Sequence, residues 1–447
     1  MSNPVTKESR AAFIKKLKNR QLILLVLFFF VAIFPAIVAL LFGGLGSWHH
    51  CLAALLGFIG LSLMLLSFIP VTRSKIVTES FNLDRVYKFH HQYSTVGFWM
   101  VVVHMVLLWL ESGVTFLQIM PLYKLSGFIC LIAAADLVFF GYFRKEMNMN
   151  YDHWKVGHSI VSAILLVFGL IHIFNLDNPY PFGMVLKVYY VCLAVFCAAS
   201  VFWLRIWVGS KEALNPFAVT EISDRGNKIY EMKLSAVGRG HQFSFRSGQV
   251  AWLTVERGPF AYRKHPFSIA SSDLDHDNLS FAIRELGDFT STIKNISVGT
   301  KAYVEGPFGC FNSDELGVDG FILIAGGIGI APIMSMLRTL DGEKDQRHIV
   351  LFYGNRDAES IGFKSELDDL STRLNLEVIH VLEKTDDPKI EKGYITEAVI
   401  KRHLPQDISN YDFFLCGPGM MVKLVDGALK DLKIPAEQIW DENYDMA

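Results

Sequence analysis

Six apolar segments that are each long enough to cross a membrane occupy the N-terminal half of this chain of 447 residues. A helix of about 20 apolar residues spans the hydrocarbon core of a bilayer. The segments cover residues 22–42, 49–69, 91–110, 122–143, 156–174 and 184–206. We therefore expect a bundle of six transmembrane helices, with the lipid bilayer as its surroundings.

Lysine and arginine residues fall on alternate loops between these segments. They gather in residues 15–20, 73–88, 144–155 and 205–211, whereas the other loops are nearly free of them. Loops rich in positive charge stay in the cytoplasm. We expect a multi-pass protein of the cell membrane, in a bacterium the inner membrane, with both termini in the cytoplasm.

Two of the six segments carry histidines fourteen residues apart, His90 with His104 and His158 with His172. Fourteen residues of helix advance by about 21 Å and return to within about 40° of the same face. The expected orientation places His90 and His158 at the cytoplasmic edge and the other two toward the outer face. Since imidazole is an axial ligand of heme iron, we expect an inner and an outer heme b, each held by one such pair.

Two alternatives to this assignment stay open. Histidines in a membrane commonly form hydrogen bonds inside the bundle without binding a metal, although matched spacing on two helices argues against that here. His91 is a rival of His90, but only His90 repeats the spacing of fourteen residues.

The sequence changes after Trp207 to short segments with turn residues and a normal charge density. Alternating runs over 228–234, 250–255, 278–284 and 301–304 predict strands of an antiparallel β-barrel. Strands alternate with helices from about residue 319, which predicts a doubly wound α/β domain. The expected parts are a cytoplasmic segment 1–20, the helical bundle 21–209, the barrel 210–315 and the α/β domain 316–447.

A glycine-rich turn opens the α/β part. Gly326, Gly327 and Gly329 lie between a predicted strand and a helix that has Pro332 in its first turn. Glycines there allow the backbone to approach a pyrophosphate, and the helix N-terminus favours anions. Many tight turns need glycine, so only the position between strand and helix indicates a nucleotide site.

Two short segments upstream suit a flavin. A hydroxyl at the end of the first can hydrogen-bond the edge of the flavin ring, and the turn and amides of the second offer an anion site. The alternative is a strand end followed by a helix cap. The residues are His265, Pro266, Phe267 and Ser268, then Gly287, Phe289 and Thr290.

Charge and cysteine content exclude other classes. The net charge of −2 and the lack of a long basic block argue against a nucleic-acid partner. The six cysteines include no C-x-x-C pair, and we expect no secreted disulfide framework. No obligatory protein partner is evident.

Several motifs together resemble the ferric reductase and NADPH oxidase superfamily, from about residue 50 to the end. Residues 84–90 and 154–158 are similar to the leads into its two heme-binding helices, and His265 to Ser268 to its flavin motif. Residues 326–332 resemble its nucleotide loop. Cys416, Gly417 and Pro418 resemble the turn that meets nicotinamide near the reactive carbon.

The resemblance also implies details of the cofactor sites. Tyr444 is expected to stack on FAD, and Leu108 stands where superoxide-forming animal members carry another histidine, which argues against oxygen as a dedicated acceptor. Arg356, just past the second strand of the α/β part, suits the 2′-phosphate of NADPH. Asp357 beside it is more typical of NADH, and we favour NADPH.

The resemblance implies a flavocytochrome b oxidoreductase. Electrons would pass from cytoplasmic NAD(P)H through FAD and two b-type hemes to ferric chelate or to oxygen, forming superoxide, beyond the membrane. The alternatives are a membrane-anchored flavoprotein reductase, an electron donor to a quinone or a periplasmic partner, and a heme-bearing sensor or assembly factor.

Overall fold

The computed structural model describes residues 7–42, 46–112, 120–177, 182–238, 243–261, 263–312 and 318–443. The chain forms two compact units. A helical unit contains Arg20–Val77 and Arg85–Trp207, and a sheet unit contains Met1–Asn19, Thr78–Asp84 and Val208–Ala447.

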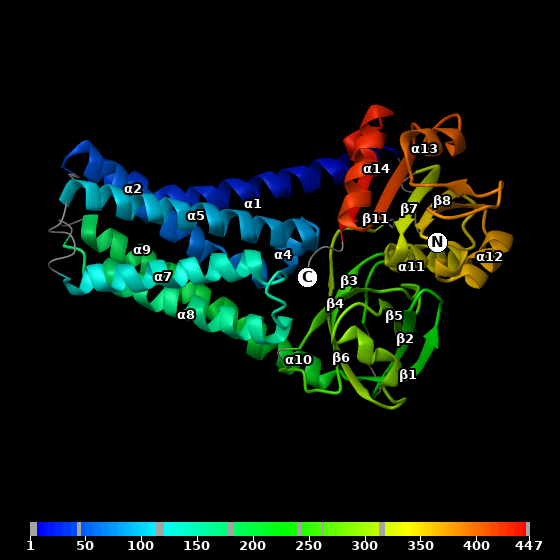
Figure 1. Cartoon of the computed structure of the whole chain (residues 1–447), viewed down its shortest axis with the longest axis horizontal. Helices are drawn as coiled ribbons and strands as arrows, with labels where there is room; N and C mark the ends of the chain where they lie inside the picture. Colours follow the sequence, from blue (N-terminus) through cyan, green and yellow to red (C-terminus); the bar gives the residue numbers. More distant parts are fainter. Residues whose placement is uncertain are drawn as a thin grey trace. The chain divides into compact units, whose positions relative to one another are not determined.

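Long apolar helices that run alongside one another form the helical unit (Figure 1). Within the described part of the chain, six helices are long and apolar enough to cross a membrane, which agrees with the six expected spans. The long helices are α1 (Lys7–Phe42), α2 (Trp48–Leu66), α5 (Leu83–Ser112), α7 (Leu122–Phe143), α8 (Tyr151–Phe174) and α9 (Phe182–Phe202), and the short ones are α3 (Phe68–Val71) and α4 (Lys75–Thr78).

Helix α2 packs closely against two neighbours. A Cβ atom on Gly60 would lie 2.8 Å from the carbonyl oxygen of Gly97 in α5, so these helices approach through small residues. The buried Tyr190 of α9 donates a hydrogen bond of 2.9 Å to the carbonyl of Phe58 in α2. These contacts position α2. The carbonyl of Ala53 in α2 and that of Ser67 at its C-terminal end each accept a hydrogen bond from a paired histidine.

The sheet unit begins with an antiparallel sheet of six strands, in the order β4-β3-β6-β1-β2-β5. The strands are β1 (Phe217–Asp224), β2 (Ile229–Ala236), β3 (Val250–Val255), β4 (His265–Ser268), β5 (Asn278–Arg284) and β6 (Lys301–Phe308), preceded by helix α10 (Gly209–Leu214). A single bridge between Ile269 and Phe281 joins the two edges of the sheet, so within the described ranges the hydrogen-bonded ladder is not that of a closed barrel.

The second sheet is parallel, with the order β10-β9-β8-β7-β11-β12. Its strands are β7 (Gly320–Gly326), β8 (His348–Asn355), β9 (Leu376–Leu382), β10 (Glu391–Lys392), β11 (Tyr411–Gly417) and β12 (Ile439–Asn443). The helices are α11 (Ile330–Glu343), α12 (Lys364–Arg373), α13 (Glu397–His403) and α14 (Gly419–Asp431).

Both faces of the parallel sheet are covered, as a doubly wound fold requires. Phe321 and Leu323 of β7 share a core with α11 and α12, whereas Ile322 and Ile324 share one with α13 and α14. Successive side chains of a strand point to opposite faces. Because both faces of this sheet are buried, β7 is apolar along its whole length. The strand order reverses between β7 and β11, where such folds bind their ligands at the carboxyl ends.

Candidate functional site

The four histidines of the apolar segments face one another in two pairs. The ring centres of His90 and His158 are 6.2 Å apart, and those of His104 and His172 are 6.5 Å apart. His91 instead contacts the ring of Tyr142 at 4.3 Å. The structure therefore brings together the pairs suggested by spacing and places His91 elsewhere.

Backbone carbonyls orient three of the four imidazoles. A carbonyl can only accept, so each of these Nδ1 atoms donates and leaves the Nε2 lone pair for a metal. The contacts are His90 Nδ1 to Ser67 O at 2.9 Å, His104 Nδ1 to Ala53 O at 2.7 Å and His172 Nδ1 to Tyr123 O at 2.7 Å. The buried Nδ1 of His158 has no partner in the described ranges.

Two glycines make room for the outer pair. A Cβ atom on Gly57 of α2 would lie 2.7 Å from Nδ1 of His104, and one on Gly127 of α7 would lie 2.9 Å from Nδ1 of His172. Both distances are shorter than real side chains allow. Sequence reasoning missed these residues, and the only signal was a glycine inside an aliphatic span.

The spacing of the rings fits a bis-imidazole heme. Two metal–nitrogen bonds of about 2 Å and two ring radii of about 1.2 Å predict ring centres about 6 Å apart. Each pair would supply two nitrogen ligands, which suits a metal whose other ligands come from a porphyrin. His90, His104, His158 and His172 therefore fit two hemes.

The glycine-rich loop lies against the turn that follows β11. A Cβ atom on Gly329 would collide with the carbonyl oxygen of Cys416, and Gly327 has a positive φ of 53°. The Tyr353 hydroxyl donates to the carbonyl of Gly327 at 3.1 Å, and burial raises the pKa of Tyr353, which keeps this donor protonated. Position 329 therefore requires glycine and position 327 favours it, and the loop leads into α11 with the buried Pro332 in its first turn.

Cys416 and Glu442 are register partners on adjacent strands at the same edge. Cys416 in β11 pairs with Glu442 in β12, and both are fully buried. Neither carboxyl oxygen of Glu442 has a hydrogen-bond partner in the part of the chain that the structure describes. Burial, followed by the charges of Asp84 and Asp441, raises the pKa of Glu442 to about 8. A neutral carboxylic acid therefore lies beside Cys416 at pH 7, and sequence reasoning gave Glu442 no role.

The remaining residues of the Cys416 turn shape the end of β11. Gly417 ends the strand, and a Cβ atom there would be 2.6 Å from Cε of Met421. Pro418 precedes the first residue of α14. The turn therefore packs tightly between β11 and α14, next to the glycine-rich loop.

The two flavin segments meet in the antiparallel sheet. The ring of His265 in β4 stacks on Phe289 with centres 4.2 Å apart and planes 8° apart. Oγ1 of Thr290 accepts from the backbone N–H of Gly287 at 2.8 Å. A short 3₁₀ helix follows over Thr290–Asn295.

The rest of the β4 segment lies along strand β3. Pro266 and Phe267 are half-buried and pair with Trp252 and Ala251. Ser268 is buried at the end of the strand, opposite Val250.

Basic residues follow two neighbouring strands of the parallel sheet. The backbone N–H of Lys384, after β9, donates to the carbonyl of Arg356, after β8, at 2.8 Å. The Asp357 carboxylate accepts from the N–H of Ser360 at 3.0 Å, and hydrogen bonds from the Ser360 side chain and backbone lower the pKa of Asp357. Asp357 therefore caps the short helix Ala358–Ser360.

Three family models match successive parts of the chain. The ferric reductase like transmembrane component matches residues 56–169, the FAD-binding domain residues 217–336 and the oxidoreductase NAD-binding domain residues 323–427. The chain belongs to the ferric reductase and NADPH oxidase superfamily. This membership confirms the resemblance drawn from the motifs. The protein contains a ferric-reductase-like membrane domain, an FAD-binding domain and an oxidoreductase NAD-binding domain.

Curated relatives of this superfamily member are reductases and related electron-transfer subunits. The reductase component of propane 2-monooxygenase from Mycolicibacterium goodii is 27% identical over 236 residues, which are 51% of this chain and 66% of the relative. Sulfhydrogenase 2 subunit gamma from Pyrococcus furiosus is 30% identical over 237 residues, 50% of this chain and 79% of the relative. The chain spans 57% to 66% of the length of the first four such relatives.

A solved structure is similar over a comparable share of the chain. The FAD/NAD-binding domain of nitric oxide dioxygenase from Vibrio cholerae is 19% identical with a TM-score of 0.46, and the match covers 52% of this chain and 98% of that one.

One predicted site residue lies outside the described ranges, and one candidate phosphate-binding residue was not predicted from the sequence. Tyr444, the expected flavin-stacking residue, belongs to residues 444–447, which the structure does not describe. Arg284, at the end of β5, places Nη1 3.2 Å from where a Cβ atom of Gly327 would lie. A guanidinium beside the glycine-rich loop suits a phosphate, and its position three residues before Gly287 was the available signal.

Proposed function

We propose that this protein is a flavocytochrome b that carries electrons from cytoplasmic NAD(P)H to an acceptor on the far side of the membrane. The observation that carries the proposal is the presence of two facing imidazole pairs, fourteen residues apart on the same two helices, in a chain that also contains FAD- and NAD-binding domains. When bound, NAD(P)H supplies a hydride, FAD separates the two electrons, and two hemes carry single electrons.

The residues of the sheet unit bind and orient the nucleotide in this proposal. Gly326, Gly327 and Gly329 admit the pyrophosphate close to the backbone at the N-terminus of α11. The Cys416 turn lies directly against that loop, where the strand order reverses. Glu442 keeps a proton at this buried edge, since burial disfavours its charged form.

The residues of the helical unit orient the metal ligands. The Nδ1 hydrogen bonds of His90, His104 and His172 hold each ring with Nε2 directed away from its own carbonyl partner. Positive charge on alternate loops supports a cell-membrane protein with cytoplasmic termini. With His90 and His158 near the cytoplasm, the outer pair then lies toward the acceptor.

Ferric chelate and oxygen are the proposed acceptors. Leu108 lies one turn after His104, where the superoxide-forming animal members have another histidine, and this favours ferric chelate. The test measures NADPH oxidation by the purified protein with ferric citrate under nitrogen, and with oxygen under superoxide detection. Reduction of ferric citrate with two b-type hemes per chain supports the proposal. A heme-free flavoprotein that reduces only cytosolic-side acceptors contradicts it.

The groups after β8 and β9 favour NADPH over NADH. Arg356 and Lys384 bring two positive charges to one edge, which suits a 2′-phosphate. The carboxylate of Asp357 already accepts hydrogen bonds from Ser360, so it serves its own loop. We expect Arg356→Ala to lower kcat/KM for NADPH about tenfold or more, the scale of one lost charged hydrogen bond. The value for NADH should stay within about twofold, and an equal loss with both nucleotides would contradict this role.

A further inference from the structure

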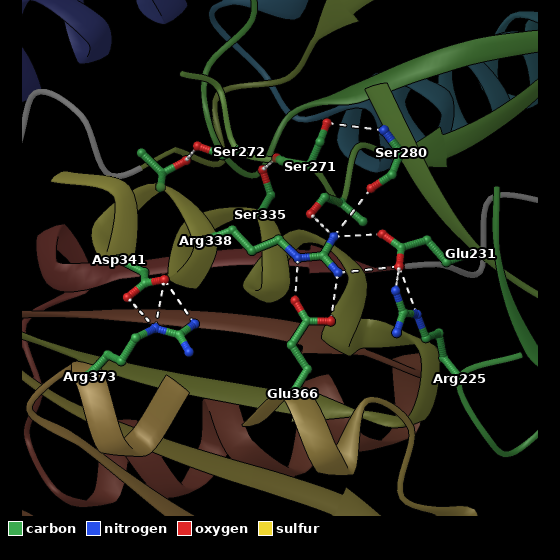
Figure 2. A network of polar contacts seen from close by, with 12 residues as sticks. Arg225, Glu231, Ser271, Ser272, Ser280, Ser335, Arg338, Asp341, Glu366 and Arg373 are labelled. Atoms are coloured by element: carbon green, nitrogen blue, oxygen red, sulfur yellow. Dashed lines mark hydrogen bonds and ion pairs between the residues drawn. The ribbon is translucent and has the colours of Figure 1, made fainter. Parts of the chain in front are cut away.

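Helix α11 joins the parallel sheet to the antiparallel sheet through one polar face. Ser335, Arg338 and Thr339 are spaced three and four residues apart, so they lie on the same side of the helix. Figure 2 shows Ser335 and Arg338 directed toward residues of the antiparallel sheet and the turn after β4. This helix begins at the end of the glycine-rich loop, so whatever holds α11 also holds that loop.

Arg338 is the centre of these contacts (Figure 2). Its guanidinium binds Glu366 of α12 with two bonds, Nε–Oε1 at 2.6 Å and Nη2–Oε2 at 2.9 Å. It binds Glu231 of β2 with two more, Nη1–Oε1 at 2.7 Å and Nη2–Oε2 at 3.3 Å. Nη1 also donates to the carbonyl of Ala270 at 2.8 Å and to Oγ of Ser280 at 3.2 Å. One side chain thus connects both sheets through a rigid, planar group.

The charges of this network balance. Glu231 is fully buried and also pairs with Arg225, at 2.6 Å. Burial alone would raise the pKa of Glu231, but the charge of Arg338 and its hydrogen bonds lower it to about 2. The carboxylate therefore stays ionised across the working pH range, and the contacts persist.

The neighbours of Arg338 on α11 hold the turn that follows the flavin segment. Oγ of Ser335 donates to the carbonyl of Ser271 at 2.6 Å. Oγ1 of Thr339 donates to the carboxylate of Asp273 at 2.9 Å, and that carboxylate accepts from the N–H of Ser247 at 2.9 Å. These hydrogen bonds connect α11 to the turn after β4 and, through Asp273, to Ser247 in the segment before β3.

We propose that Arg338 is a positioning residue for flavin reduction, which fixes the glycine-rich loop against the flavin-binding strands. The inference rests on the proposed function, because it assumes that NAD(P)H bound at the loop reduces a flavin bound at β4. Transfer between two bound groups depends steeply on their alignment, and an error of about 1 Å costs about a hundredfold in rate. An arginine with bidentate bonds on both sides limits such motion more strongly than the single ammonium group of a lysine.

The same two helices offer a matched control. Arg373 of α12 forms a bidentate pair with Asp341 of α11, with Nε–Oδ1 at 2.9 Å and Nη2–Oδ2 at 2.9 Å. Its side chain is 51% exposed, and its bonds in Figure 2 join only these two helices. Loss of this pair removes an arginine between α11 and α12 but leaves the antiparallel sheet untouched.

The test follows flavin reduction by saturating NADPH in the full-length, cofactor-loaded protein, by anaerobic stopped flow. We expect Arg338→Met to lower the limiting rate about tenfold or more and Arg338→Lys to lower it less, with Arg373→Met within about twofold of the unchanged protein. The affinity for NADP⁺, the flavin content and the rate of flavin reduction by dithionite should stay unchanged in all three. A general loss of structure would change these readouts together.

A double variant guards against misfolding. Arg338→Met leaves Glu231 buried beside Arg225 alone, whereas Arg338→Met with Glu231→Gln removes the excess charge. The double variant should bind flavin and still be reduced slowly. A flavin-loaded Arg338→Met protein, or the double variant, that NADPH reduces at the unchanged rate would overturn the inference. Failure of NADPH and NADH to reduce the flavin of the unchanged protein would instead refute the proposed function.

Discussion

Replacing Gly57 by alanine should remove the outer heme while leaving the inner one. The new Cβ atom would lie 2.7 Å from Nδ1 and 2.9 Å from Cε1 of His104, where ordinary contact begins at 3.4 Å. The ring must therefore move by about 0.7 Å, and the 2.7 Å hydrogen bond to the carbonyl of Ala53 is stretched or lost.

The size of the effect follows from two contributions. Overpacking in a tight core costs about 1–3 kcal/mol, and a lost hydrogen bond about 0.5–1.5 kcal/mol. A total of about 1.5–4.5 kcal/mol corresponds to heme binding weakened about 10- to 1,600-fold, since about 1.4 kcal/mol is a factor of ten. The three atoms nearest to the new Cβ atom all belong to His104, whereas the carbonyl partner of the inner pair belongs to Ser67.

The assay is the heme content per chain, from the pyridine hemochrome spectrum of purified protein. We expect about two hemes in the unchanged protein and about one in Gly57→Ala, because only one His pair is displaced. Gly141→Ala is the control, since a Cβ atom there meets no atom within 4 Å. Two hemes with an unchanged spectrum in Gly57→Ala would show that the outer heme does not depend on a glycine at this position.

Three further predictions concern the inner pair and the edge of the parallel sheet. His90→Ala should remove the inner heme and His91→Ala should keep it, as judged by heme content, because only His90 faces His158. Cys416→Ala should slow flavin reduction by NADPH in stopped flow with heme content unchanged, because Cys416 lies against the glycine-rich loop. The folded pKa of Glu442, about 8, exceeds its ordinary value of 4.5, so its contribution to stability is complete below about pH 4.5 and is lost as the pH rises to about 8. Glu442→Gln stays neutral, so the temperature of flavin release should fall less between pH 5 and 8 than in the unchanged protein, and an identical decline would contradict the assignment.

Elements with a strong apolar pattern could be predicted from the sequence, and those with mixed composition could not. The predicted strands 250–255 and 278–284 coincide with β3 and β5. Strand β12 was missed because Trp-Asp-Glu-Asn resembles a solvent-exposed turn, although Glu442 within it is buried. This segment forms a strand because it pairs with β11 over five residues, and such a long-range contact is not visible in the local sequence.

The same contrast holds for the candidate sites. The pairing of His104 with His172 follows from helical periodicity, which is a local property. The need for Gly57 and Gly127 depends on which helix packs beside each histidine, so spacing along the chain does not reveal it. Arg338 was missed for a similar reason, because a charged residue on a helix is ordinarily exposed. Its ion pairs with Glu231 and Glu366 join residues that are far apart in the sequence and form only when the two sheets pack together.

The most direct test of the account is an anaerobic absorbance spectrum of the purified full-length protein before and after NADPH is added. We expect about two b-type hemes per chain, both of them reduced by NADPH, and the loss of one heme in His172→Ala. A yellow protein without a Soret band, or a protein whose flavin is reduced while its hemes stay oxidised, would contradict it.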